Sequence, residues 1–433
     1  MRAQRYPASS GQRLLWMIDH YRPDYGALNC PMLCRLRGPL APDSLHTAVQ
    51  ELSTRHDALR TTFSGWGRRL TQHVHPHSEL QVREVDLSQR PDPEAALWES
   101  VAEDLATRVD PQVWPTRATL WRLGPRDHVF SLTAHHLVSD AWSCGVLFND
   151  LRRLYAAHTG NGTPPEPPRV QYPEFTLAQQ ELLDGDGLQR HRAYWQRRLE
   201  GAELPAIPRG ATAATDTNGM GTGVAAHPLP AHVAEALRTL ASSKRSTPFA
   251  AMLAVYYELL RRRTGQSDMA VASLFANRPR RELHDTVGFL ANMVVLRTQL
   301  PTRGSFLDLL RATHATVIGA FTYQEMPYQL LPANTISIGR ARADDVVFQM
   351  VSDPGHRASA AGVEFELLVP EQIGSRFAFE LTLVPQGRGL RAVLFHRRDW
   401  VSPQWAEEFV AQYVSLAGAL AATPEAPLAS VGQ

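Results

Sequence analysis

The chain has 433 residues and a formal net charge of +1, with 44% hydrophobic and 20% charged residues. The length predicts two lobes of about 200 residues each, and the composition is typical of a globular protein. The near-neutral charge argues against a dedicated nucleic-acid binder or a binder of anionic membranes. Neither a run of about 18 apolar residues nor an apolar leader is found, so we expect a cytoplasmic protein without a membrane segment.

The three cysteines are an odd number without the spacing of metal ligands, and we expect them to be reduced thiols of a cytoplasmic protein: Cys30, Cys34 and Cys144. The spacing of the first two invites a disulfide. No secretory signal precedes them, however, which argues against that pairing.

Apolar spacing and start signals in the first part of the chain predict three helices: Ser9–Ile18, Asp43–His56 and Pro93–Asp110, the last capped by Asp92. Alternating patterns predict strands within Leu70–Val85 and at Thr116–Leu123. Within the first of these segments, His73, His75 and His77 have a spacing that can bind zinc. Pro76 interrupts the run and no carboxylate or cysteine is close, so we expect a solvated strand edge and no metal site.

The stretch Ser131–Ser143, SLTAHHLVSDAWS, joins a predicted strand to a predicted helix. The apolar run Asp127–Leu137 predicts a buried strand, and helical spacing continues to about His158. Ser139 or Asp140 is placed to cap the helix. Adjacent residues of a strand point to opposite faces, so one of the two histidines can face inward and the other a cleft.

An imidazole at a strand-to-helix corner suits proton transfer at physiological pH. The other interpretation of His135 and His136 is a pair of core histidines that bond to backbone carbonyls.

The segment Thr159–Pro168, TGNGTPPEPP, is the clearest linker, and it predicts an N-terminal lobe of residues 1–170 and a C-terminal lobe of 171–433. A polar stretch, Arg209–Gly223, is expected to be a surface loop. The second part of the chain further predicts helices and strands as follows: helices in Leu177–Leu199 with a break at Asp184–Gly187, at Ser246–Thr264, Phe306–Ala320 and Pro403–Ala421, and strands at Asp268–Phe275, within Val287–Leu300, and at Asp345–Val351, Arg376–Val384 and Leu390–His396.

The stretch around the two histidines resembles the HHxxxDG motif of condensation domains of nonribosomal peptide synthetases, within the HHxxxD acyltransferase superfamily of chloramphenicol acetyltransferase. Ala141 stands where the family has glycine. Further segments resemble family motifs in the right order: Ser9–Ile18, the RHDALRTTF of Arg55–Phe63, the ANRPRR of Ala276–Arg281 and the strand segment Val287–Leu300. The resemblance runs from Ser9 to about Trp400.

The resemblance implies an α/β fold of two chloramphenicol acetyltransferase-like sandwich lobes in a V-shaped pseudo-dimer. The active site would lie in the tunnel between them, and a segment of the C-terminal lobe would cross over to the first.

The resemblance also assigns roles to residues around the motif. It implies that His136 is the catalytic histidine, as a general base or as a group that positions the attacking atom and stabilises charge. His135 would hold the loop. Asp140 would not orient His136 but would form an ion pair across the lobes with Arg278, an arginine of the C-terminal lobe. The tunnel and substrate-binding residues would be Ser139, Ala141, Trp142 and Asn292, the last as a hydrogen-bond donor.

By resemblance we expect a free-standing condensation enzyme of nonribosomal peptide, natural-product or antibiotic biosynthesis. It would transfer an acyl or aminoacyl group from a carrier-protein phosphopantetheine thioester to an amine or hydroxyl acceptor, forming an amide or an ester. The sequence has no GxSxG elbow and no cysteine–histidine constellation typical of acyl-enzyme chemistry, which agrees with direct transfer.

We expect a monomer without a permanently bound cofactor, whose partners are an acyl or peptidyl carrier protein and a small-molecule acceptor. Two other functions stay open. One is a coenzyme A- or carrier-dependent acyltransferase of the same superfamily that acts on a free small molecule. The other is a catalytically silent condensation-like module that recruits a partner protein.

Overall fold

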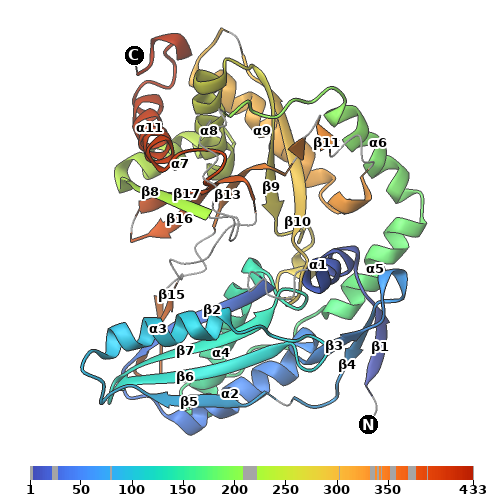
Figure 1. Ribbon diagram of the computed structural model, residues 1–433, viewed down its shortest axis with the longest axis vertical. Helices are drawn as coiled ribbons and strands as arrows, with labels where there is room; N and C mark the ends of the chain where they lie inside the picture. Colours follow the sequence, from blue (N-terminus) through green and yellow to red (C-terminus); the bar gives the residue numbers. More distant parts are fainter. Residues whose placement is uncertain are drawn as a thin grey trace. The chain divides into compact units, whose positions relative to one another are not determined.

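The chain forms two compact units in the computed structural model (Figure 1). The structure describes residues 3–21, 28–78, 80–207, 222–301, 303–331, 337–338, 341–342, 344–351, 357–368, 377–387 and 389–432. The first unit consists of Met1–Leu188, Ala276–Ala291 and Pro354–Ile373, and the second of Gln189–Phe275, Asn292–Asp353 and Gly374–Gln433. The first unit therefore continues beyond the predicted boundary at residue 170 and takes in two later segments.

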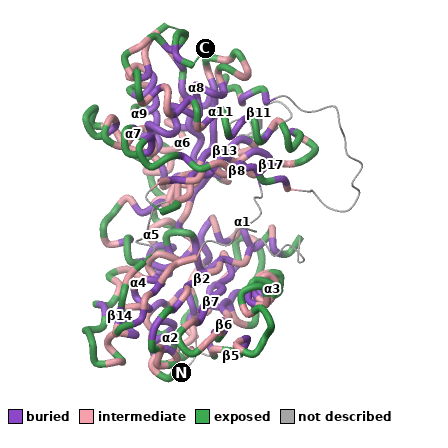
Figure 2. The backbone as a smooth tube through the Cα atoms, turned by 90° about the vertical axis from the view of Figure 1, so that its left-hand side faces the viewer, coloured by how far each residue is buried: buried purple, intermediate pink, exposed green. Residues whose placement is uncertain are grey.

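A six-stranded sheet forms the centre of the first unit. Its strands, in spatial order, are β14 (Arg357–Ala360), β15 (Val363–Leu368), β2 (Asn29–Arg37), β7 (Asp127–His135), β6 (Thr116–Gly124) and β5 (Val82–Asp86). All neighbours are antiparallel except β5 and β6. The central strand β7 is buried at every position after Asp127, which agrees with its nearly continuous apolar sequence (Figure 2).

Helices cover both faces of this sheet. The helices of the unit are α1 (Ser10–Tyr21), α2 (Pro42–Arg55), α3 (Pro93–Ala106), α4 (Ala141–His158) and α5 (Tyr172–Asp184). Buried apolar residues of α2 and α4 pack on one face, where they meet Met32, Phe130 and Leu132. Leu97 and Val101 of α3 pack on the other face. A smaller three-stranded sheet has the order β1 (Gln4–Pro7), β4 (Thr71–Val74) and β3 (Thr61–Ser64).

A late segment of the chain supplies two strands of the first unit's sheet. β15 pairs antiparallel with β2, with Glu366 opposite Arg35, and β14 pairs with β15. The Arg37 guanidinium lies 2.7 Å from the Glu366 carboxylate, which ties the inserted strand to β2 through an ion pair.

The second unit is also α/β. Its sheet has the order β10 (Asn292–Gln299), β9 (Asp268–Phe275), β13 (Val346–Met350), β16 (Phe379–Gln386), β17 (Gly389–Arg397) and β8 (Thr222–Leu229). β13 runs parallel to both of its neighbours, and the other pairs are antiparallel. The remaining elements are α6 (Gly187–Leu199), α7 (Ala231–Ser243), α8 (Pro248–Thr264), α9 (Phe306–Thr322), α11 (Pro403–Ala422) and the short strands β11 (Ser337–Ile338) and β12 (Ala341–Arg342).

The predicted linker Thr159–Pro168 contains neither helix nor strand. It is nevertheless fastened to the first unit, because the Arg55 guanidinium donates to the carbonyl of Pro165 at 3.0 Å and also to that of Glu166. It therefore does not separate the two compact units.

Three further predictions need adjustment. The helix predicted to Asp110 ends at Ala106, because the backbone at Thr107 is extended. Of the stretch expected as a surface loop, residues 209–221 lie outside the described residues, and Thr222 and Gly223 begin β8, which the sequence patterns missed. Arg376, the first residue of a predicted strand, also lies outside the described residues, and β16 begins at Phe379.

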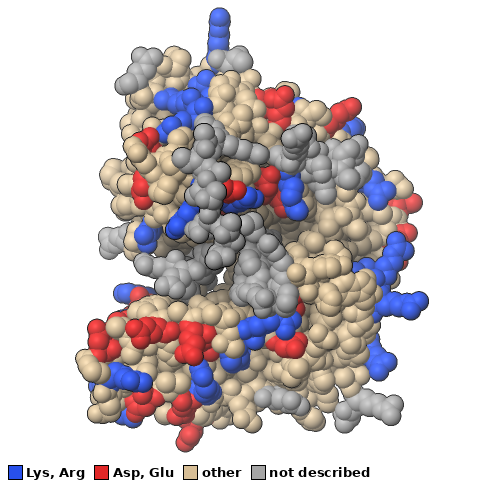
Figure 3. Space-filling model, in the orientation of Figure 1, with Lys and Arg blue, Asp and Glu red and all other residues tan. Residues whose placement is uncertain are grey.

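Basic and acidic side chains both occur on the face shown in Figure 3. This agrees with a net charge near zero. In the described part of the chain, no helix is long and apolar enough to cross a membrane.

Candidate active site

The two adjacent histidines and Asp140 lie on the turn between β7 and α4. β7 ends at His135, and Asp140 is the N-cap residue of α4, where its carboxylate accepts a hydrogen bond from the Ser143 N–H at 2.8 Å. This is one of the two capping residues that the sequence predicts. Ala141 begins the helix and is not among the non-glycine residues with positive φ, so its backbone needs no glycine.

His136 has a defined tautomer in its neutral form. Its Nδ1 lies 2.9 Å from the carbonyl oxygen of Ser139, which only accepts, so Nδ1 carries the proton. The lone pair of a neutral ring is then on Nε2. No hydrogen bond to Nε2 is found among the residues that the structure describes. The ring is only partly buried, so Nε2 is available to a group that enters the site.

His135 points into the protein instead. Its side chain is 1% exposed, and its Nδ1 accepts a hydrogen bond from the Leu137 N–H at 3.1 Å, which fixes the turn. Its Nε2 lies 3.5 Å from a carboxylate oxygen of Asp19. Burial opposes the charge of Asp19, but interactions with His135 and Arg108 hold the pKa of that carboxyl below its ordinary value.

The Asp140 carboxylate is buried and accepts hydrogen bonds from six donors. Oδ1 accepts from the N–H and hydroxyl of Ser143 and from Arg278 Nη2, at 2.7–3.1 Å. Oδ2 accepts from Arg278 Nη1 at 2.9 Å and from the N–H groups of Leu290 and Ala291 at 3.1 Å. Burial raises the pKa of Asp140, but the charge and hydrogen bonds of Arg278 and Ser143 outweigh it and lower the pKa.

Arg278 forms a buried ion pair with Asp140; the two side chains are 1% and 3% exposed. Arg278 also donates to the carbonyls of Ala276 and Thr286, at 2.9 and 3.1 Å. The residues that link Asp140 to the segment Ala276–Ala291 thus form one network within the first unit. The prediction that Arg278 belongs to a second lobe is therefore wrong, because its segment packs into the unit that contains Asp140. Asp140 accepts its hydrogen bonds from this network, and His136 Nδ1 donates to the Ser139 carbonyl instead of to Asp140. Asp140 therefore holds the turn and does not orient the imidazole.

Phe289 forms a wall beside His136. The two rings meet edge to face, with 5.7 Å between centroids and 80° between planes. On another side, a Cβ atom added to Gly11 would lie 2.8 Å from the Phe289 ring, so helix α1 also touches it. The hydroxyl of Tyr172 donates to the Phe289 carbonyl at 2.8 Å. The Phe289 ring is therefore held in place by contacts on both its ring and its backbone.

The remaining predicted site residues have different surroundings. Trp142 is 39% exposed, and its indole N–H donates to the His284 carbonyl at 2.8 Å. The Ser139 hydroxyl is buried without a hydrogen-bond partner among the described residues. Asn292 belongs to the second unit, where its amide donates to the carbonyls of Gln324 and Met326 at 2.7 and 2.5 Å. Both donors of this amide are thus used, which argues against donation to a substrate.

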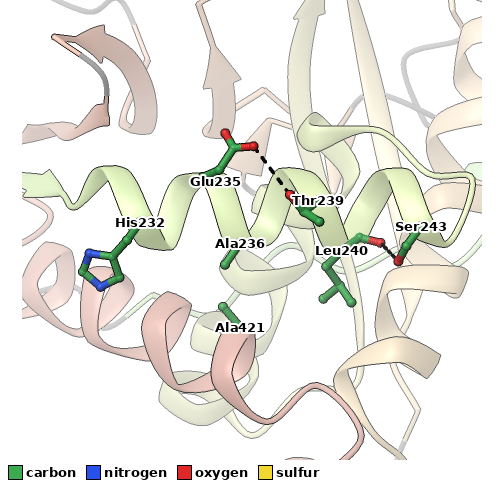
Figure 4. Close-up of a pocket in the computed structure, with 7 residues that line it drawn as sticks. All are labelled: His232, Glu235, Ala236, Thr239, Leu240, Ser243 and Ala421. Atoms are coloured by element: carbon green, nitrogen blue, oxygen red, sulfur yellow. Dashed lines mark hydrogen bonds between the residues drawn. The ribbon is translucent and has the colours of Figure 1, made fainter.

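Other candidate sites carry less chemistry. His73 and His75 bond to hydroxyls of Ser64 and Thr62 at 2.7 and 2.8 Å. No group of three or more metal-ligand side chains is found within the described residues. A shallow hollow on α7 and α11 gathers few groups that could act on a ligand: Glu235 bonds to Thr239 and Ser243 bonds to a backbone carbonyl (Figure 4).

The sequence matches the family described as Condensation domain over residues 2–432. The chain belongs to this family. Condensation domains are in general acyltransferases that form amide bonds in nonribosomal peptide biosynthesis.

Among its relatives, phosphinothricin tripeptide synthetase PhsC of Streptomyces viridochromogenes is 35% identical over 395 residues, or 87% of this chain. One of the linear gramicidin synthase proteins of Brevibacillus parabrevis is 31% identical over 444 residues, which cover 99% of this chain. The matched regions are 35% and 6% of those two proteins, so the chain spans a small part of these relatives.

Solved structures share the fold. The condensation domain of the monacolin K polyketide synthase MokA gives a TM-score of 0.85 at 21% identity and covers 99% of both chains. The SgcC5 protein of Streptomyces globisporus, solved with (R)-(-)-1-(2-naphthyl)-1,2-ethanediol and sucrose, gives 0.77 at 26% identity, with 97% of this chain and 100% of that chain covered. The predicted fold class of two α/β, chloramphenicol acetyltransferase-like lobes is confirmed.

Several residues of this condensation domain's site were not singled out from the sequence. Ser143 bonds to Asp140, Arg278 and Gly288 through its hydroxyl. The Phe289 ring and the N–H groups of Leu290 and Ala291 also belong to the site. The available signal was the sequence GFLAN, which ends at Asn292 and belongs to a segment that resembles a family motif. The residues just before the asparagine contact His136 or donate hydrogen bonds to the Asp140 carboxylate.

Proposed function

We propose that this condensation domain transfers an acyl or aminoacyl group from the phosphopantetheine thioester of a carrier protein to a nucleophilic acceptor. The observation that supports this function best is the tautomer and accessibility of the His136 imidazole. Its Nδ1–H is held by the Ser139 carbonyl, which leaves the Nε2 lone pair on a partly exposed ring. A lone pair so placed suits removal of a proton from an amine or a hydroxyl.

The reaction follows from that lone pair. The acceptor N–H or O–H gives its proton to Nε2 as its nitrogen or oxygen attacks the thioester carbonyl carbon. The tetrahedral oxyanion collapses, the C–S bond breaks, and the leaving thiolate takes the proton from Nε2. Backbone N–H groups at a helix start are suitable donors to the oxyanion, and no hydrogen bond to the Ala141 N–H is found in the described part of the chain.

The surrounding network supports positioning rather than proton relay. Asp140 already accepts from six donors, and it holds the first turn of α4 to the segment of Leu290 and Ala291. A carboxylate so fully bonded stays ionised and has no reason to take a proton during turnover. We propose that Asp140 and Arg278 fix the turn while His136 acts on the substrate.

An amine is the first acceptor class, because amide formation is general in the family. A hydroxyl is the second, because the related SgcC5 was solved with an aromatic vicinal diol, a molecule with two hydroxyl groups. We propose that Ala141 and Trp142, both exposed at the start of α4, contact the substrates.

The experiment presents acyl groups on carrier proteins and, separately, as coenzyme A thioesters, with panels of amine and alcohol acceptors. Products are followed by mass spectrometry. Product that forms only from carrier thioesters and is lost in His136→Ala supports the proposal. Product from coenzyme A thioesters with a free small molecule favours the alternative acyltransferase. Binding of a carrier or another synthetase protein without product in any combination favours the silent module.

A further inference from the structure

Two cysteines far apart in the sequence meet beside the candidate active site. The Sγ atoms of Cys30, on β2, and Cys144, in the first turn of α4, are 3.6 Å apart. Both thiols are free. A disulfide bond is about 2.05 Å long, so a modest approach of the two side chains would close one. The third cysteine, Cys34, is fully buried on the same strand, where its Sγ lies 3.7 Å from the Arg35 carbonyl.

The pair lies between β2, which neighbours β7 in the sheet, and α4, the helix that follows the His136 turn. Cys30 pairs across the sheet with Ala134, the residue before His135. The Cys144 N–H donates to the Asp140 carbonyl at 3.1 Å. A disulfide between the two sulfurs would therefore link β2, the neighbour of β7 in the sheet, to α4, the helix that follows the turn.

We propose that Cys30 and Cys144 are a modification site, a thiol pair that hydrogen peroxide oxidises to a disulfide, that a dithiol reductant restores, and that thereby alters the His136 turn. In the first step the sulfur of Cys144 attacks the peroxide O–O bond, giving a sulfenic acid and one water. In the second, Cys30 attacks the sulfenic sulfur, the S–S bond forms and a second water leaves. The two thiols lose two electrons and two protons in total, and the peroxide is reduced.

The order of the steps follows from access. Cys144 is partly exposed, whereas Cys30 is only 8% exposed. The hydrogen bond with Cys144 and then burial raise the pKa of the Cys30 thiol well above its ordinary value, while His136 and Ser139 act in the opposite direction. A buried, protonated thiol reacts slowly with peroxide, so Cys144 is oxidised first.

The consequence for the site passes through Ser139. Its hydroxyl is buried beside Cys30, and its carbonyl accepts the Nδ1–H of His136. Closing the S–S distance by about 1.5 Å draws the start of α4 towards β2, and Ser139 directly precedes Asp140, the N-cap residue of that helix. A displacement of about 1 Å in a catalytic group can cost up to about a hundredfold in rate, so oxidation is expected to lower turnover at least about tenfold.

The test treats the full chain with hydrogen peroxide and then blocks remaining thiols before proteolysis. The expected results are an intact mass lower by two hydrogens and a peptide that links Cys30 to Cys144, both reversed by dithiothreitol. Cys34→Ala is the matched control and should give the same linked peptide. Cys144→Ala, at a partly exposed position that should tolerate the change, should give none.

A second readout is independent of any assay with substrates. The imidazole nitrogen resonances of His136, assigned by comparison with His136→Ala, should shift on oxidation of the native chain and return on reduction. They should stay unchanged by peroxide in Cys144→Ala. Absence of the linked peptide, a link through Cys34 instead, or a link that leaves the His136 resonances unmoved would overturn the inference. Because mass and resonance need no turnover, these outcomes are separate from failure of the proposed acyl transfer.

Discussion

The ring of Phe289 meets the imidazole of His136 edge to face, 5.7 Å between centroids, and the same ring touches helix α1 at Gly11. The side chain thus fills the space between a helix near the N-terminus and the histidine that we propose as the proton acceptor. Its position depends on the absence of a side chain at Gly11, where an added Cβ would lie only 2.8 Å from the ring.

Gly11→Ala is therefore expected to displace the Phe289 ring. Turnover should fall several-fold, because displacing a group that packs on a catalytic side chain by a fraction of an ångström to about 1 Å lowers the rate. Gly418→Ala is the matched control, because Gly418 also lies in a helix and an added Cβ would meet its nearest neighbour at an ordinary 3.8 Å. Replacing the phenylalanine ring with the smaller leucine side chain, in the double variant Gly11→Ala/Phe289→Leu, should restore part of the turnover rate. Equal activity of Gly11→Ala and Gly418→Ala would show that the ring position does not matter.

His136→Ala is expected to lower turnover by about two orders of magnitude or more, the usual effect of losing a positioned proton-transfer group. Circular dichroism and thermal unfolding should remain close to those of the native chain, because the side chain is partly exposed and makes one hydrogen bond. His158→Ala is the control, since His158 bonds to Glu51 on the surface at the other end of α4. Full activity of His136→Ala on the true substrates would mean that the active site lies elsewhere.

Asp140→Ala should destabilise the chain on the order of 3 kcal/mol, because the Arg278 charge would stay buried without its partner. Asp86→Ala serves as the comparison: its ion pair with Arg122 is about half exposed, so its loss should destabilise the chain far less. Urea unfolding measures both. Asp140→Ala should also lower the melting temperature more than His136→Ala does. Equal midpoints for the two aspartate variants would contradict this account.

The free energy of unfolding should depend on pH through the lowered pKa of Asp140. Burial opposes its charge, but Arg278 and Ser143 hold its pKa below the ordinary value in the folded chain. Near pH 4, where an unfolded aspartate takes up its proton, the unfolded chain binds more protons than the folded one, so folding loses stability as pH falls. The stability difference between the native chain and Asp140→Asn should be constant above about pH 5 and shrink below about pH 4. Parallel curves down to pH 3 would count against it.

Ala141→Gly tests the departure from the family motif. The backbone there is helical without positive φ, so glycine relieves no strain and only removes an exposed methyl group. We expect a broader range of accepted substrates, little change in turnover of the native pair, and a stability loss of up to about 1 kcal/mol. A panel of acyl donors and acceptors measures the range. A manyfold gain on the native pair would instead indicate a site impaired by the alanine.

Local patterns predicted the elements that carry the site. The apolar run ending at the histidines became β7, the helical spacing after Asp140 became α4, and its end at His158 was predicted from the same spacing. The end of α8 at Thr264 also agrees with the predicted helix, because the next residue, Gly265, adopts the left-handed conformation that glycine favours. These features depend on neighbours within one or two turns.

The partners brought together from distant segments could not be read in this way. The resemblance supplied Arg278 for Asp140, but nothing local indicated that Leu290 and Ala291 would add their N–H groups to the same carboxylate. Cysteine spacing drew attention to Cys30 and Cys34, whereas the sheet and helix packing place Cys30 against Cys144. β14 and β15 escaped prediction because short strands that a distant segment of the chain adds to a sheet have little periodicity of their own.

The pairing of β15 with β2 has a consequence for how the chain is made. On the ribosome, the first 188 residues emerge long before Val363–Leu368, so the hydrogen-bonding edge of β2 stays open during most of synthesis. An open edge pairs readily with other strands, including those of neighbouring nascent chains. Fragments that stop before residue 357 should therefore aggregate on expression, which the soluble fraction of the lysate measures.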